Sequence, residues 1–128
     1  MSWMLDTHAL LWALTDDERL SSRAREILGD PRAVVHVSAA TAWEISLKVA
    51  RGRLEIPFPA DRLLEIVTGA LRLTPLPIDF SHALAAGALP PIHRDPIDRL
   101  LVAQAQALGA TIVTGDRQIA RYAVPTVW

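Results

Sequence analysis

The chain contains no cysteine, only one lysine and few aromatic residues. Without cysteine it can form neither a disulfide nor a thiolate metal site, which fits a reducing compartment, and we expect a cytoplasmic protein. Aromatic residues make up 5% of the 128 residues, so the core must consist mainly of aliphatic side chains. The single lysine is Lys48, and the other 12 basic residues are arginines, whose guanidinium groups suit bidentate contacts with phosphate.

Long apolar runs, a leader segment and a strong excess of one charge are also absent. No stretch approaches the ~20 apolar residues of a membrane span, so we expect no association with a membrane. The first residues lack the basic and apolar segments of a signal peptide. The net charge of −1 excludes a general attraction to nucleic acid, so binding of RNA or DNA needs a local basic patch.

What the chain has in quantity is apolar side chains. They make up 51% of the residues, which excludes a disordered protein, and the length predicts one domain spanning residues 1–128. A mean hydropathy of +0.23 is high for a small monomer and predicts an apolar surface that a partner covers.

Strands and helices are predicted to alternate along the whole chain. The strands are expected at 2–5, 33–38, 71–76, 110–114 and 124–127, and the helices at 9–13, 20–28, 39–51, 61–71, 79–89 and 96–108. Apolar runs without polar alternation are typical of parallel strands buried on both faces, and two-residue hairpin turns are absent. We therefore predict an α/β fold, a three-layer α/β/α sandwich with a central parallel sheet.

Three acidic residues lie at or near the ends of predicted strands. Asp6 follows the first strand and Asp116 follows the strand at 110–114. Glu44 lies about one and a half turns into the helix after the strand at 33–38. Because parallel strands end at the same edge of a sheet, and ligands bind at that edge in open α/β sheets, we expect the three carboxylates to converge there.

Two more acids, Asp95 and Asp98, open the helix at 96–108 and share one face of it. An ordinary strand–helix unit is expected to place this helix start at the opposite end of the sheet, unless the preceding loop brings it back over the cleft. A structural role is open for each acid, since Asp6 and Asp95 can cap helices and Glu44 can be a solvated helix residue.

Carboxylates that crowd at one edge repel one another unless they are protonated or neutralised. A hard divalent cation is the usual solution, and Mg²⁺, with Mn²⁺ as a substitute, prefers carboxylate oxygen and water. Two such ions can orient a water and stabilise a phosphoryl transition state. The pattern therefore indicates metal-assisted hydrolysis of a phosphodiester.

Four motifs together resemble the PIN-domain ribonucleases and, within them, the VapC toxins of toxin–antitoxin pairs. They are residues 5–12 (LDTHALLW), 37–45 (VSAATAWEI), 93–105 (HRDPIDRLLVAQA) and 112–116 (IVTGD). They occur in the order that the family has and span the whole chain. The resemblance implies the parallel α/β/α fold and a Mg²⁺-dependent endoribonuclease toxin that hydrolyses RNA with a metal-activated water. It also implies a cognate small antitoxin and a homodimer.

The resemblance assigns the acids as well. Asp6, Glu44 and Asp98 match the core acidic triad of the family and Asp116 its fourth acid, so all four are expected to bind metal and act in catalysis. Asp95 is an additional acid of the Asp-Pro-x-Asp subgroup and a further candidate ligand. The family brings the helix start that carries Asp98 to the acidic edge, which the spacing did not show.

Polar residues near the acids are expected to support them. Thr7, Ser38 and Thr114 can hydrogen-bond the carboxylates. Three arginines flank the acids and can hold RNA phosphates: Arg94, Arg99 and Arg117.

Other residues near the acids have plainer interpretations. His93 is interpreted as a loop residue or a substrate contact rather than a ligand. The basic run of Lys48, Arg51 and Arg53 is interpreted as a solvated helix end. Trp3, Trp12 and Trp43 are expected in the core or at a dimer contact rather than stacked on bases.

Alternative functions were weighed on the same residues. A phosphatase or a receiver-like signalling domain needs a suitably placed lysine, and Lys48 lies on the helix of Glu44, which disfavours both. A dinucleotide-binding fold lacks its Gly-rich loop here. A PIN nuclease of RNA maturation without an antitoxin is a further alternative. The last is a non-catalytic PIN-like binding module, which is expected to lose acids that this chain keeps.

Overall fold

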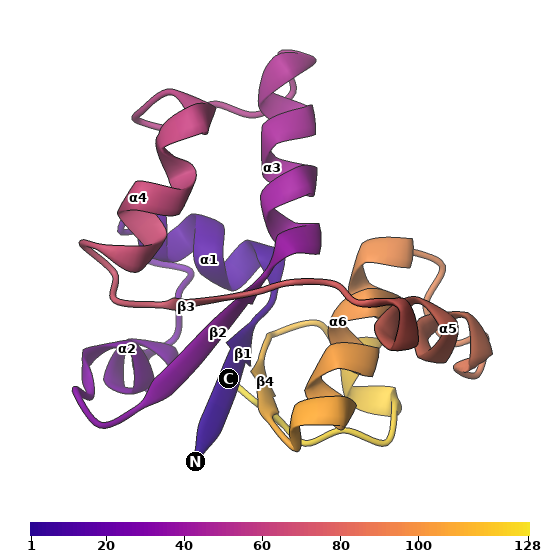
Figure 1. The fold of residues 1–128 in the computed structure, drawn as a ribbon. Helices are drawn as coiled ribbons and strands as arrows, with labels where there is room; N and C mark the ends of the chain where they lie inside the picture. The colour runs from indigo at the N-terminus through magenta and orange to yellow at the C-terminus, as the bar shows by residue number, and fades with distance from the viewer.

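A five-stranded parallel sheet forms the centre of the computed structural model, which describes all residues 1–128 (Figure 1). The strands are β1 (Ser2–Leu5), β2 (Val34–Ser38), β3 (Thr74–Leu76), β4 (Thr111–Val113) and β5 (Thr126–Val127). Their order is β3-β2-β1-β4-β5, and every neighbouring pair is parallel. The predicted central parallel sheet is confirmed, with the first strand in the middle.

Helices cover both faces of this sheet. They are α1 (Thr7–Leu14), α2 (Ser22–Gly29), α3 (Ala39–Ala50), α4 (Leu63–Thr68), α5 (Phe80–Ala88) and α6 (Pro96–Leu108), with short 3-10 helices η1 (Ala60–Arg62) and η2 (Ile119–Arg121). Figure 1 shows α1, α2 and α4 on one side of the sheet and α5 and α6 on the other. The predicted α/β/α sandwich is therefore confirmed. None of these helices has the length and apolar character needed to cross a bilayer.

Alternate residues of the central strands feed two separate cores. Leu5 and Val113 pack in the core on the side of α1, whereas their neighbours Met4 and Ile112 pack in the core against α6. Successive side chains of a strand point to opposite faces, so a continuous apolar run supplies both cores. As expected from the composition, the buried apolar residues are aliphatic, with Tyr122 as the one aromatic ring.

Capping residues start the helices directly at the carboxyl edge of the sheet. Asp6 caps α1, Ser38 caps α3, and Asp95 caps α6, each by accepting a hydrogen bond from a backbone N–H of the first turn. Pro96 stands in the first turn of α6, and Gly109, with φ of 66°, ends that helix. The acids of this edge are thus built into the start of two helices.

Two predicted elements are longer than the observed ones. The helix predicted at 61–71 is α4 preceded by η1, and it ends at Thr68. The strand predicted at 71–76 begins only at Thr74. Arg72 has a φ of 53°, in the left-handed region, which no strand residue can adopt. The chain therefore turns between α4 and β3.

Helix α6 begins at the carboxyl edge of the sheet, so the expectation that its start lies at the opposite edge is wrong. The helix ends at Leu108 and feeds β4 at Thr111, so its last turn lies at the amino edge. Its 13 residues span about 20 Å at 1.5 Å per residue, enough to cross the sheet. A helix that leads into a parallel strand must run antiparallel to it, and its start then lies where the strands end.

The packing of α6 against the sheet predicts a large loss of stability in Leu101→Ala. Leu101 is fully buried in the second core, and its truncation should lower the free energy of unfolding by about 2–5 kcal/mol. Leu108→Ala, on the same helix but 40% exposed, is the matched control and should cost under about 1 kcal/mol. Urea denaturation of both variants checks this, and equal losses would contradict it.

Candidate metal centre

His93, Asp98 and Asp116 form the tightest group of possible metal ligands. His93 Nε2 lies 3.1 Å from Asp98 Oδ2 and 3.0 Å from Asp116 Oδ2. One ligand atom from each of the three residues lies within 4.8 Å of the others. Asp98 comes from the first turn of α6, Asp116 follows β4, and His93 belongs to the loop before α6. The carboxyl edge of the sheet therefore joins segments that are far apart in the chain.

Asp6 is the most buried acid of this edge, with 4% of its surface exposed. Its Oδ1 accepts a hydrogen bond of 2.8 Å from the N–H of Ala9, and its Oδ2 accepts one of 2.5 Å from Thr114. The hydroxyl oxygen of Thr114 in turn accepts the N–H of Asp116 at 3.0 Å. Thr114 thus contacts a carboxylate as expected, and it links Asp6 to Asp116.

Glu44 is held at the same edge by two polar side chains, one of which contacts a third. Its Oε1 accepts a hydrogen bond of 2.7 Å from Thr7, and its Oε2 accepts one of 2.8 Å from Lys48. The hydroxyl oxygens of Thr7 and Thr41 lie 3.3 Å apart. Because Thr7 directly follows Asp6, this bond holds Glu44 next to the end of β1.

The pKa of Asp98 shows how strongly the carboxylates are crowded. Burial, the largest cause, and the charges of Asp95, Asp6 and Asp116 together raise the pKa of Asp98 to about 7, against the opposing effect of His93. Burial also raises the pKa of Asp6 above its ordinary value. Near neutral pH the site therefore retains a proton on a group that is normally ionised, and a divalent cation could replace that proton.

His93 hydrogen-bonds Asp116 through Nε2, and the same atom lies 3.1 Å from Asp98 Oδ2. Its Nδ1 accepts the backbone N–H of Asp95 at 3.2 Å, so a neutral His93 carries its proton on Nε2, which faces Asp98 and Asp116. Burial raises the pKa of Asp116, but the hydrogen bonds from His93 and from the N–H of Gln118 outweigh it, and the net pKa is lowered. In this tautomer Nε2 has no free lone pair, so His93 positions the carboxylates rather than binding an ion.

The available donors fit a hard divalent cation. Asp98 and Asp116 offer carboxylate oxygens to one point, and Asp6 shares their electrostatic environment. Oxygen ligands without thiolate are the set that Mg²⁺ and Mn²⁺ prefer. Asp95 lies close enough for its charge to raise the pKa of Asp98, while its Oδ1 caps α6 through the N–H of Ile97.

Two of the residues expected to assist the acids are engaged elsewhere. Ser38 is buried, and its hydroxyl accepts the N–H of Ala40 instead of contacting a carboxylate. Arg99 donates to the backbone carbonyls of Ala86, Leu89 and Pro90. Its guanidinium group is thus used to close the C-terminal end of α5, which replaces the expected contact with RNA phosphate.

Arg94 and Arg117 remain available on the surface. Both are exposed and neither forms an ion pair, although Arg117 directly follows Asp116. The expectation that these two arginines meet RNA is therefore compatible with where they lie.

Two residues of the site have roles that the sequence interpretation did not give them. His93 is a loop residue, as predicted, and in addition its Nε2 lies between Asp98 and Asp116. Thr41 was not singled out at all. The spacing of Thr41 and Glu44, three residues apart on one helix, was the available signal, because i,i+3 residues share a face.

Two clefts adjoin the acids on different sides. One, of about 510 Å³, contains Asp6 and Asp116 in its lining. The other, of about 230 Å³, lies beside Glu44 and is lined by three cations: Lys48, Arg51 and Arg53. Arg51 and Arg53 form no ion pair, so the basic run that was interpreted as a solvated helix end also lines a groove next to the acidic edge.

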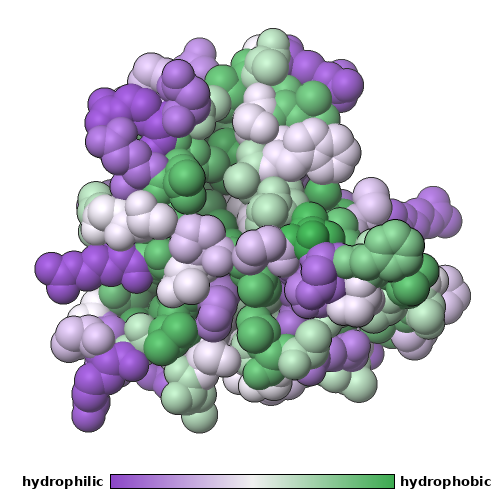
Figure 2. All heavy atoms as spheres, viewed as in Figure 1, coloured by the Kyte–Doolittle hydropathy of each residue, from purple (hydrophilic) through white to green (hydrophobic).

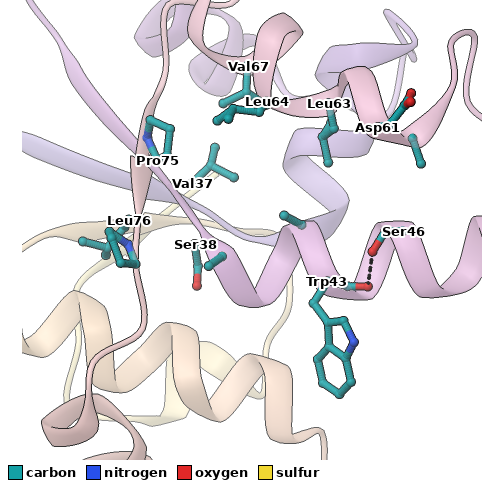
Figure 3. Close-up of a pocket in the computed structure, with 14 residues that line it drawn as sticks. Val37, Ser38, Trp43, Ser46, Asp61, Leu63, Leu64, Val67, Pro75 and Leu76 are labelled. Carbon is teal, nitrogen blue, oxygen red and sulfur yellow. Dashed lines mark hydrogen bonds between the residues drawn. The ribbon is translucent and has the colours of Figure 1, made fainter.

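A third cavity, of about 490 Å³, is apolar and lies between α3, α4 and β3 (Figure 3). Trp43 and Leu64 belong to its lining and are 61% and 64% exposed. Figure 2 shows hydrophobic atoms along the middle of this face, with hydrophilic groups toward its margins. Trp43 is therefore not a core residue, and its expected contact with a second chain stays a prediction.

Comparison with known proteins gives consistent matches over the whole chain. The family model of the PIN domain matches residues 3–125. Ribonuclease VapC22 of Mycobacterium tuberculosis is 32% identical over 135 residues, an alignment that covers 98% of this chain and 97% of that protein.

Solved structures share the fold at lower sequence identity. VapBC2 from Rickettsia felis, bound to a DNA fragment from its promoter, matches with a TM-score of 0.73 and 18% identity, covering 99% of this chain and 98% of that chain. DNA-bound VapBC from Salmonella typhimurium matches with a TM-score of 0.68 and 22% identity, covering 99% and 97%. At these identities the likeness concerns the fold.

The raised pKa of Asp98 predicts how the stability of the metal-free protein depends on pH. A pKa raised from 3.8 to about 7 means that the folded state binds the proton more tightly than the unfolded state. The contribution of Asp98 to the free energy of unfolding should therefore be complete below about pH 4 and fall until about pH 7, by up to about 4 kcal/mol. Mg²⁺ should restore stability above pH 7.

Urea denaturation from pH 4 to 8, in EDTA and in Mg²⁺, checks this prediction against Asp98→Asn. The variant cannot ionise at this position, so the difference in unfolding free energy between it and the wild type should follow the titration of Asp98. A difference that stays constant over this pH range would contradict the predicted pKa shift.

Proposed function

The chain belongs to the PIN-domain family, and we propose that it is a Mg²⁺-dependent endoribonuclease, the toxin of a type II toxin–antitoxin pair. The observation that carries this proposal is the convergence of Asp6, Asp98 and Asp116 at the carboxyl edge, with the pKa of Asp98 raised to about 7. The relative named ribonuclease VapC22 supports RNA as the substrate and the toxin role.

In this proposal the acids hold the cation. The proposed ligands are Asp6, Asp98 and Asp116, since the charges of Asp6 and Asp116 both raise the pKa of Asp98. Glu44 lies at the same edge of the sheet, and Asp95 adds a further negative charge at the start of α6. Bound Mg²⁺ would activate a water for in-line attack on phosphorus and offset the charge that develops on the phosphate.

The remaining side chains of the site orient these acids. His93 Nε2 faces Oδ2 of Asp98 and Oδ2 of Asp116, so it holds one oxygen of each carboxylate close to the other. Thr114 fixes Asp6 and Thr7 fixes Glu44. Hydrogen bonds of this kind keep the ligand oxygens in place before the substrate arrives, so little reorganisation is needed in the reaction.

Cations around the acids supply the binding of RNA phosphates. Arg94 and Arg117 lie on the surface beside the acids without ion pairs, and the groove beside Glu44 adds Lys48, Arg51 and Arg53. A protein with a net charge of −1 needs such a local patch to attract RNA. We place the protein in the cytoplasm, where its RNA substrate is found.

We further propose two protein partners, a cognate small antitoxin and a second copy of this chain. The solved relatives with the same fold are VapBC complexes, which supports an antitoxin. The apolar surface around Trp43 and Leu64 supports a homodimer, because large exposed apolar patches usually mark contacts between chains.

The reaction itself is tested by cleavage of labelled single-stranded RNA and total tRNA in Mg²⁺ or in EDTA. We expect cleavage in Mg²⁺ alone, and a loss in Asp6→Asn and Asp98→Asn greater than the ~10–100-fold that removal of a supporting hydrogen bond costs. Asp30→Asn, at the turn before β2, is the control and should cleave like the wild type.

The results separate the alternatives. Cleavage that survives both substitutions would mean that the active site lies elsewhere. RNA binding without cleavage of any substrate would favour a non-catalytic PIN-like module. Cleavage without inhibition by a neighbouring gene product would favour a nuclease of RNA maturation that has no antitoxin.

The homodimer is tested by light scattering on the purified protein. We expect a dimer, and we expect Leu64→Glu to give monomers, because a charge at an apolar interface is costly to desolvate. Glu65→Gln, on the exposed side of the same helix, is the control and should remain dimeric. A wild type that is already monomeric, or a variant that remains dimeric, would contradict this assignment.

A further inference from the structure

We propose that the cleft beside Asp6 and Asp116 binds a nucleobase of the RNA, next to the phosphate that is cut. The proposal rests on the proposed ribonuclease function and deepens it, since it assigns a residue set that selects the substrate. The cleft measures about 510 Å³, and its lining combines the two acids with three ring-bearing side chains: His8, Trp12 and Trp128.

The three rings of this cleft contact one another at tilted angles and form one aromatic cluster. His8 and Trp12 lie one turn apart on α1, with ring centroids 5.6 Å apart and planes tilted by 40°. Trp12 and Trp128 lie 5.7 Å apart with planes tilted by 57°. His8 is exposed and Trp128 is 38% exposed, so a flat ligand can reach them.

Gly115 brings one of these rings next to the acids. A Cβ on Gly115 would lie 3.2 Å from both Cε2 and Nε1 of Trp128, so the indole rests directly against the backbone of this residue. Gly115 separates Thr114, which holds Asp6, from Asp116. The indole therefore lies one residue from a predicted metal ligand, which is where the base of a nucleotide would lie when its phosphate is at the acids.

The charges of the cleft favour a base over a phosphate. Arg19 is the one cation in its lining, and the guanidinium carbon lies 4.9 Å from the centroid of the Trp12 ring. The guanidinium also contacts both carboxylate oxygens of Asp17, at 3.1 and 2.8 Å, which neutralises its charge. A phosphate would thus meet acids and no free cation here. The groove beside Glu44, with Lys48 and two arginines, is the place for the backbone.

Single-stranded nucleic acids are bound in just this way by many proteins, with cations along the backbone and aromatic rings against the bases. The two clefts on either side of the acids divide these tasks. The scissile phosphate then lies between them, and the aromatic cleft contacts the neighbouring base.

The indole N–H signals in a ¹H–¹⁵N spectrum test this directly, because the chain has four tryptophans and two of them lie outside the cleft. The four nucleoside 5′-monophosphates are titrated in Mg²⁺, with ribose 5-phosphate as the probe that lacks a base. We expect the signals of Trp12 and Trp128 to shift with at least one nucleotide, while Trp3 stays unchanged. Ribose 5-phosphate should shift neither Trp12 nor Trp128, and any shift of Trp43, which lines the groove beside Glu44, should be the same with it as with a nucleotide.

Three results would overturn the proposal. One is the absence of any shift at Trp12 and Trp128. Another is an equal shift with ribose 5-phosphate, which would mean a phosphate site. The third is a shift at Trp43 that needs the base and occurs without one at Trp12 or Trp128, which would place the base beside α3.

A second experiment tests the proposal by measuring affinity for RNA. In Asp98→Asn protein, which should not cleave, we expect Trp128→Leu to weaken binding of a single-stranded 12-mer by roughly 5- to 150-fold, the range for loss of one stacked base. Trp128→Phe keeps an aromatic ring and should recover most of the affinity, which a purely structural role would not require. Phe80→Leu removes an 82% exposed ring at the start of α5, outside both clefts, and is the control that should bind like the parent. Equal affinities of the Leu and Phe variants would contradict the proposal.

The two proposals fail in different ways. A protein that cleaves RNA but shows no shift at Trp12 and Trp128 retains the ribonuclease function and loses the base site. A protein that shows these shifts with intact RNA loses the ribonuclease function and retains the base site.

Discussion

The repulsion between carboxylates that the fold holds at one edge of the sheet is the constraint on which the rest of the structure depends. Burial and the charges of its acidic neighbours together raise the pKa of Asp98 to about 7. Folding therefore brings like charges together at a cost, which hydrogen bonds from Thr7, Thr114 and His93 partly offset. The same crowding becomes an affinity for a divalent cation, since the ion replaces repulsion by attraction.

The backbone shares in this arrangement because two of the acids begin helices. Asp6 caps α1 and Asp95 caps α6, so each carboxylate accepts a backbone N–H and lies at the positive end of a helix. The strands β1 and β2 are each followed directly by a helix that starts at the carboxyl edge, whereas α6 follows α5 and is brought to this edge by the loop that carries His93. The acids are thus stabilised by the elements that place them.

The basic side chains fall into two groups, those that form ion pairs and those that do not. Five arginines form ion pairs with acids outside the site, and Arg99 binds the carbonyls at the end of α5. Arg94 and Arg117 beside the acids form no ion pair, nor do Arg51 and Arg53 in the groove beside Glu44. Paired guanidinium groups serve the fold, whereas those without an acidic partner are available to phosphate. In the aromatic cleft Arg19 is paired with Asp17, so the lining offers aromatic rings instead of an unpaired cation.

Local patterns in the sequence predicted the order of strands and helices, the parallel sheet and the caps at Asp6 and Asp95, because hydrophobic periodicity and capping act over a few residues. The assignment of the four acids as one set came from the resemblance to the PIN-domain family. The tertiary structure decided what depends on contacts through space. The direction of α6 put Asp98 at the acidic edge, and loop folding put His93 between two acids that the chain separates. Ser38 and Arg99 were drawn into backbone contacts instead. No local signal reports these contacts, since each requires the position of a second, distant segment.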